Sequence, residues 1–181
     1  IDTARNVVAT TVQTGMQAGA DMVGAVAEDV SDVVSTTAEV AEAAQGFEQK
    51  SLFDTHKGCV AAVDGLLLKI IRPSRTTVGN VQSFFSGHYK SFGINVQAAC
   101  DSKCRFVYVS CNSPGGANDI AAYRNSSLPE LVQALPLKYY VVGDNAYICD
   151  EHMLTPFLGH HKLDPRNDEY NFFLSWKITQ A

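Results

Sequence analysis

The sequence of 181 residues predicts an α/β fold, in which a mixed β-sheet is flanked by helices and preceded by an N-terminal helical extension. Three observations support this prediction. From residue 58 onward, short apolar runs rich in strand-forming residues alternate with turn signals. Helix signals fall between the third and fourth of these runs. Residues 1–46 instead space their apolar side chains at steps of three and four, which indicates an amphipathic helix.

The N-terminal segment carries a heptad-type stripe of apolar residues. The stripe consists of Val12, Met16, Val23, Val26, Val30, Val33 and Val40. Three glycines interrupt it, and each weakens a helix by about 1 kcal/mol relative to alanine. A coiled coil and a loosely ordered helical extension therefore both stay open. We predict a helical, Ala/Val-rich acidic extension over residues 1–50, which offers a surface for a second copy or a helper protein.

Charge separates this extension from the rest of the chain. Residues 1–50 carry eight acids and two bases, a net charge of −6, whereas residues 51–181 carry eleven acids and twelve bases, a net charge of +1. The balance of the main domain neither favours nor excludes nucleic acid. The odd number of cysteines, five, indicates reduced thiols in an intracellular protein. No apolar stretch reaches 18 residues and no secretory signal is evident, so no membrane span is expected.

Three strands open the main domain. The first is predicted over residues 59–71, with a break near residues 64 and 65. The second is predicted over residues 93–100, where apolar side chains alternate, and the third over residues 105–111. The loop that follows contains a Pro-Gly-Gly turn signal.

A helix then separates the third strand from a fourth. Asp119 is well placed as the N-cap of a helix over residues 119–125, and one or two helical turns follow over residues 129–135. The fourth strand is predicted over residues 138–143. Two further helices are predicted, one over residues 149–157 and a final one from residue 170. The order β-β-β-α-β-α is the opening of a ribonuclease H-like fold, in which the first and fourth strands lie side by side in the mixed sheet.

Two aspartates end the two apolar runs that this topology brings together. Asp64 follows the run Val-Ala-Ala-Val, and Asp144 follows Tyr-Tyr-Val-Val-Gly. A carboxylate at the end of a buried strand needs a partner, and two of them side by side repel each other. A divalent cation resolves that conflict and creates a hydrolytic site. The alternative is that each aspartate is a turn residue beside a glycine, but the pair in this topology favours a metal site.

Basic residues follow the first aspartate along the chain. They are Lys69, Arg72, Arg75, His88 and Lys90, with Tyr89 and Phe92 available for stacking. Such a group is typical of a surface that binds the phosphates of DNA without reading the base sequence. An ordinary solvated surface explains the same residues equally well, and this alternative stays open.

Five collinear segments resemble a known family. They are GCVAAVDGLLLKIIRP, SGHYKSFGINVQAACD, CRFVYVSCNSPGGANDIAAYRNSSL, LKYYVVGDNAY and YNFFLS. Together, over residues 58–175, they resemble the DDE-superfamily endonuclease domain, and most closely the PIF/Harbinger-type transposases and the host proteins derived from them. The resemblance implies metal-dependent hydrolysis and strand transfer of DNA phosphodiesters with Mg²⁺ or Mn²⁺. It also implies a nuclear or otherwise intracellular protein.

The resemblance also assigns roles to individual residues. It implies that Asp64 is the first catalytic aspartate, which bridges two metal ions, and that Asp144 is the second. Asp119 matches a recurring aspartate and becomes an accessory candidate. The third acid of the family, a glutamate, would fall one residue beyond Ala181, so the resemblance implies truncation before it. Two functions are therefore expected for residues 51–181: a DDE nuclease domain, active or inactive, or a non-catalytic domesticated interaction protein.

Overall fold

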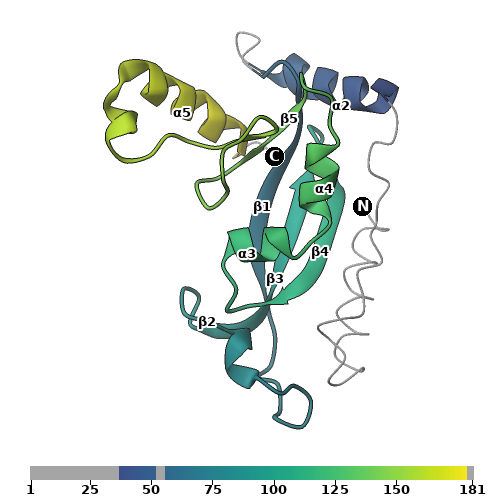
Figure 1. Cartoon of the computed structure of the whole chain (residues 1–181), viewed down its shortest axis with the longest axis vertical. Helices are drawn as coiled ribbons and strands as arrows, with labels where there is room; N and C mark the ends of the chain where they lie inside the picture. Colours follow the sequence, from purple (N-terminus) through teal and green to yellow (C-terminus); the bar gives the residue numbers. More distant parts are fainter. Residues whose placement is uncertain (1–36, 52–55, 179–181) are drawn as a thin grey trace.

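The computed structural model of the chain describes residues 37–51 and 56–178 (Figure 1). The described elements are, in chain order, α2 (Thr37–Lys50), β1 (Cys59–Lys69), the 3₁₀ helix η2 (Val81–Phe84), β2 (Phe85–Ser86), β3 (Ser91–Cys100), β4 (Phe106–Pro114), α3 (Asp119–Arg124), α4 (Leu128–Gln133), β5 (Tyr140–Gly143), β6 (Met153–Leu154), the 3₁₀ helix η3 (Gly159–Leu163) and α5 (Pro165–Ile178). The predicted valine stripe, up to Val33, lies outside the described residues. Its proposed role in assembly stays a prediction.

The strands form one mixed sheet in the order β4–β3–β1–β5–β6, and β2 pairs with the beginning of β3. Strand β1 is antiparallel to β3 and parallel to β5. The first and fourth long strands of the prediction are thus neighbours at the centre of the sheet. This arrangement confirms the predicted α/β class and is consistent with a ribonuclease H-like fold.

Helices cover both faces of the sheet and one of its ends. Figure 1 shows α3 and α4 over one face and α2 across the end where β1 begins. On the opposite face, Leu174 of α5 packs with Cys59, Ala62 and Val142. Each helix in the described part of the chain is too short or too polar to span a lipid bilayer.

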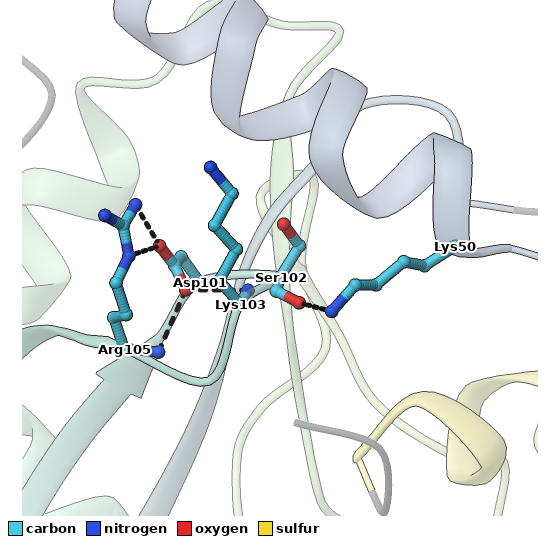
Figure 2. A network of polar contacts seen from close by, with 5 residues as sticks. All are labelled: Lys50, Asp101, Ser102, Lys103 and Arg105. Carbon is cyan, nitrogen blue, oxygen red and sulfur yellow. Dashed lines mark hydrogen bonds and ion pairs between the residues drawn. The ribbon is translucent and has the colours of Figure 1, made fainter.

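Helix α2 packs on the sheet although it belongs to the predicted extension. Val40, Ala44 and Phe47 follow the three- and four-residue spacing of one helix face, and all three are buried. Lys50, at the end of α2, donates a hydrogen bond to the backbone carbonyl of Ser102 in the β3–β4 turn (Figure 2). Whether residues 1–50 as a whole form a separate extension stays a prediction.

The predicted break in the first strand is wrong. Strand β1 continues through residues 64 and 65, because its pairing with β3 is regular from Ala62↔Cys100 to Lys69↔Gly93. Only the β5 side is irregular, between Cys59 and Ala61. The long β1 therefore reaches well past the end of the shorter β5.

The predicted helix over residues 149–157 is also wrong. Strand β6 lies there instead, parallel to β5, because the Asp150 carboxylate accepts hydrogen bonds from the backbone N–H groups of His152 and Met153, both at 2.8 Å. The last helix begins at Pro165 rather than at residue 170. Proline favours the first turn of a helix, and the Asp164 carboxylate accepts the Arg166 backbone N–H at 2.9 Å.

Candidate active site

Asp64 and Asp144 lie at neighbouring positions of two parallel strands. The last paired residues of β1 and β5 are Val63 and Gly143, and each is followed by one of the two aspartates. Beyond this point β5 gives way to a turn, in which the Asp144 carboxylate accepts the backbone N–H of Ala146 at 2.8 Å. The structure therefore places Asp64 and Asp144 at neighbouring positions, at the point where the pairing of β1 with β5 ends.

The charge around Asp64 is unbalanced. Partial burial raises the pKa of its carboxyl, a hydrogen bond from the Gly65 N–H at 2.7 Å lowers the pKa, and the negative charges of Asp144 and Asp119 raise it further. The net effect is a raised pKa. Negative charge has therefore been gathered at this point of the fold, and a bound cation would stabilise the ionised form of Asp64.

Asp119 is not the N-cap of α3, contrary to the prediction. Asn118 takes that position, and its side chain accepts the Ala121 backbone N–H at 2.9 Å. Asp119 lies in the first turn, and its Oδ1 accepts a hydrogen bond from Asn95 Nδ2 on β3 at 3.0 Å. The N-cap explanation for an aspartate at this position is thereby removed.

Gly65 provides the space that Asp119 occupies. A Cβ atom on Gly65 would lie 2.3 Å from Asp119 Oδ1 and 2.8 Å from Gln97 Nε2, and Cβ contacts under 3.0 Å essentially never occur. The glycine after Asp64 therefore allows the carboxylate from α3 to reach the sheet. In the Asp-Gly pair, the glycine is thus required for packing, in addition to the metal-binding role predicted for the aspartate.

Sequence reasoning missed three buried polar residues behind the acids. Asn95 and Gln97 lie two residues apart on β3 and so share a face of the sheet. Tyr147 follows the Asp144 turn, and its hydroxyl donates to Gln97 Oε1 at 2.8 Å. The available signal was the alternation Asn-Val-Gln, which puts two amides on the inward face of an otherwise apolar strand.

The oxygen donors fit a hard divalent cation. Among the described residues, no group of three or more His, Cys, Asp or Glu side chains is arranged to hold a metal ion. The Asp64–Asp144 pair offers carboxylate oxygens, which Mg²⁺ and Mn²⁺ prefer. Mg²⁺ usually binds one or two carboxylates and completes its coordination with waters and substrate phosphates, so two neighbouring acids suit it.

The predicted DNA-contact residues lie together at the other end of β1. Lys69 ends β1, and residues 70–92 form an excursion with its own small core of Val78, Val81 and Phe84; we call residues 69–92 the basic lobe (Figure 1). The five predicted residues, Lys69, Arg72, Arg75, His88 and Lys90, are all exposed. No acidic residue occurs between Asp64 and Asp101, so the lobe's positive charge has no counterpart within it.

Strand β1 connects Asp64 with the basic lobe. Lys69 lies five residues after Asp64, a distance of about 17 Å along an extended strand. A hollow of about 430 Å³ lies elsewhere, between α2, α4 and the sheet, and none of the three acids lines it. The three acids therefore lie outside that hollow.

Comparison with known protein families identifies the family of this domain. A model of the DDE superfamily endonuclease family matches residues 63–179, a span that contains all three acids. The chain belongs to the DDE superfamily endonuclease family. The resemblance predicted from the sequence is therefore confirmed.

This DDE domain also has a curated relative. It is similar to "Protein ALP1-like" of Arabidopsis thaliana, with 30% identity over 129 residues. The match covers 62% of this chain and 31% of the relative, so the chain spans about a third of that protein's length. No solved structure matches the chain.

Proposed function

We propose that this DDE domain is a metal-dependent nuclease domain of PIF/Harbinger-type origin, which cuts or joins DNA phosphodiesters. The observation that carries the proposal is the register Val63↔Gly143, which ends two parallel strands on Asp64 and Asp144 inside the family-matched span. Mg²⁺ or Mn²⁺ is the cofactor of the proposed reaction. A protein that acts on DNA works where DNA is, so a nuclear location is part of the proposal.

The two aspartates would hold the cation through their carboxylate oxygens. A bound divalent cation supplies an activated water and stabilises the charge that develops on phosphate oxygens. The hydrogen bond from Ala146 N–H orients the Asp144 carboxylate, and that from Gly65 N–H orients the Asp64 carboxylate. The orientation of each carboxylate is therefore fixed. A bound cation would offset the electrostatic repulsion between the two carboxylates.

The basic lobe would hold the DNA strand beside the acids. Its lysine and arginine side chains are exposed and contact phosphates without reading bases. The guanidinium of Arg72 lies 5.7 Å from the centre of the Phe92 ring, which gives it a fixed position on the lobe. Binding should weaken steeply as salt rises, because each neutralised phosphate releases counterions.

The test is nicking of supercoiled plasmid by the full chain with Mg²⁺ or Mn²⁺. We expect Asp64→Asn and Asp144→Asn to lose about a hundredfold or more in rate, because each removes one carboxylate ligand of the activating cation. The matched control is Glu130→Gln, which neutralises an exposed acid on α4 and should nick as the wild type does. Equal nicking by all of these proteins would refute the catalytic proposal.

A non-catalytic interaction protein is the second candidate. One observation favours it: large apolar side chains are exposed along η3, α5 and the segment before them, namely Phe157, Leu158, Leu163 and Phe172. Exposed apolar side chains that are close along the chain favour contact with another protein. Sedimentation velocity of the wild type and of Leu163→Lys tests self-association. A smaller mass for the variant supports assembly through this surface, and a monomeric wild type argues against it.

A further inference from the structure

A row of hydrogen bonds crosses the buried face of the sheet from the Asp144 turn to Asp119. Tyr147 Oη donates to Gln97 Oε1 at 2.8 Å, Gln97 Nε2 donates to Asn95 Oδ1 at 2.9 Å, and Asn95 Nδ2 donates to Asp119 Oδ1 at 3.0 Å. The three donor residues are 5%, 1% and 6% exposed in that order, so water does not compete with the row. We call Tyr147, Gln97 and Asn95 the donor row.

The donor row has a fixed direction. Asn95 Nδ2 meets two acceptors, Asp119 Oδ1 and the backbone carbonyl of Ala117 at 3.1 Å, so its amide has one possible orientation. Asn95 Oδ1 must then accept from Gln97, and Gln97 Oε1 must accept from the Tyr147 hydroxyl. Every donor in the row therefore points toward Asp119.

The position of the row links the candidate acids to one another. Tyr147 comes three residues after Asp144, in the turn that Ala146 closes on the Asp144 carboxylate. At the other end, Asp119 lies where a side chain on Gly65, the neighbour of Asp64, would collide with it. The donor row thus extends from the turn that contains Asp144 to the Asp119 carboxylate, which lies against the residue after Asp64.

Stability alone does not call for such a row. Buried polar groups are costly unless every partner is met, and apolar side chains of the same size fill a core as well. A fully satisfied row, by contrast, fixes the direction of the group on which it ends. That group here is the Asp119 carboxylate, which lies against Gly65, the residue that follows Asp64.

We infer that Asn95, Gln97 and Tyr147 are positioning residues, which hold the Asp119 carboxylate near the Asp64–Asp144 pair so that its negative charge, without a direct bond to the cation, adds to the pair's affinity for a divalent cation. The inference rests on the proposed function, because it assumes that this pair binds a cation. Groups that surround the direct ligands of a metal ion typically contribute 10–100-fold to metal affinity, which sets the size of the expected effect.

The test is Mn²⁺ binding to the full chain by titration calorimetry. We expect Asn95→Leu to weaken Mn²⁺ binding roughly tenfold, because Asp119 loses its donor, and Tyr147→Phe to weaken it by a smaller factor. Tyr147→Phe keeps the ring and removes one hydroxyl, so its Mn²⁺ affinity tests the positioning role even if Asn95→Leu does not fold. The matched control is Tyr123→Phe, which removes a hydroxyl from a ring 5.5 Å from that of Tyr147 and should bind Mn²⁺ like the wild type.

A thermodynamic cycle separates positioning from a structural role. In an Asp119→Asn background, the donor row has no carboxylate to orient, so Tyr147→Phe should no longer change Mn²⁺ affinity. A loss of the same size in both backgrounds would overturn the inference. Wild-type affinity in both Tyr147→Phe and Asn95→Leu would overturn it too, while leaving the proposed function intact. A wild type that binds no Mn²⁺ would overturn the proposed function itself.

Discussion

Two aspartates, Asp101 in the turn after β3 and Asp64 in β1, have opposite surroundings. Asp101 closes the β3–β4 turn and accepts hydrogen bonds from the backbone N–H groups of Lys103 and Arg105, at 2.8 and 2.9 Å. The Arg105 guanidinium adds two contacts of 2.7 Å to its second oxygen (Figure 2). Asp64 accepts a hydrogen bond from its neighbour Gly65 and faces two further acids.

The pKa shifts of these two acids follow from that difference. Burial alone would raise the pKa of Asp101, but the hydrogen bonds and the charge of Arg105 outweigh burial and lower it. Burial and neighbouring acids raise the pKa of Asp64. The fold therefore stabilises the ionised form of Asp101 and disfavours the ionised form of Asp64.

The largest expected effect is a difference in unfolding free energy between variants of Asp101 and Asp64. Asp101→Asn should lower the free energy of unfolding by about 2 kcal/mol, because the amide group that replaces Oδ2 cannot accept hydrogen bonds from the Arg105 guanidinium. Asp64→Asn should stay within about 0.5 kcal/mol of the wild type, because it removes the repulsion from the neighbouring acids and leaves an oxygen that can still accept the Gly65 N–H. Urea unfolding of the metal-free chain measures both values. Similar losses in the two variants would contradict the comparison.

Gly65→Ala should test the space beside Asp64. The added methyl group would meet the Asp119 carboxylate and the Gln97 amide, so we expect a loss of about 2 kcal/mol in unfolding free energy. We also expect weaker Mn²⁺ binding, because Asp119 would be displaced. The control is Gly79→Ala, where no atom lies within 4 Å of the new Cβ. A Gly65→Ala protein as stable as Gly79→Ala would show that Asp119 moves aside freely.

The pH dependence of stability should differ in sign between the two aspartates. The folded-state pKa of Asp101 is below its ordinary value of 3.8, so its stabilisation is present above pH 3.8 and is lost as pH falls through the folded pKa. The folded-state pKa of Asp64 is raised, so its ionisation opposes folding at neutral pH and ceases to do so in acid.

Chemical unfolding from pH 7 to pH 3 measures this difference. The stability gap between wild type and Asp101→Asn should be widest at neutral pH and should narrow below pH 3.8. The free energy of unfolding of Asp64→Asn, relative to that of the wild type, should be highest at neutral pH and should decrease as the pH falls. A gap for Asp101→Asn that does not change with pH would mean that its charge does not stabilise the fold.

The sequence predicted that Asp64 and Asp144 lie side by side, because strand pairing follows simple rules. Apolar runs that end on Asp64 and Asp144 signal buried strands, and the element order puts those strands side by side. Strand lengths were harder, because β1 is stabilised beyond residue 63 by β3 alone. That long-range pairing leaves no local trace, so the regular strand was mistaken for one with a break.

Local signals failed where two residues compete for one role. Asn118 and Asp119 are both good N-caps, and only the packing of α3 against β3 decides that Asn118 caps the helix while Asp119 turns toward Asn95. The donor row was missed because a buried Asn or Gln shows its partners only in three dimensions. Likewise, Asp150 looked compatible with a helix, although its carboxylate holds the backbone N–H groups that begin β6.

The smallest expected effect separates capping from site chemistry on α3. Asn118→Ala removes the side-chain acceptor for the Ala121 N–H and should lower unfolding free energy by about 1 kcal/mol, without changing Mn²⁺ affinity. Asp119→Asn should do the reverse, with a smaller change in stability and a clear loss of Mn²⁺ affinity, because it keeps an oxygen for the Asn95 amide and removes only the charge. Urea unfolding and calorimetry on the two variants measure both quantities. If Asp119→Asn instead behaves like Asn118→Ala, the charge of Asp119 stabilises the fold and does not contribute to cation binding.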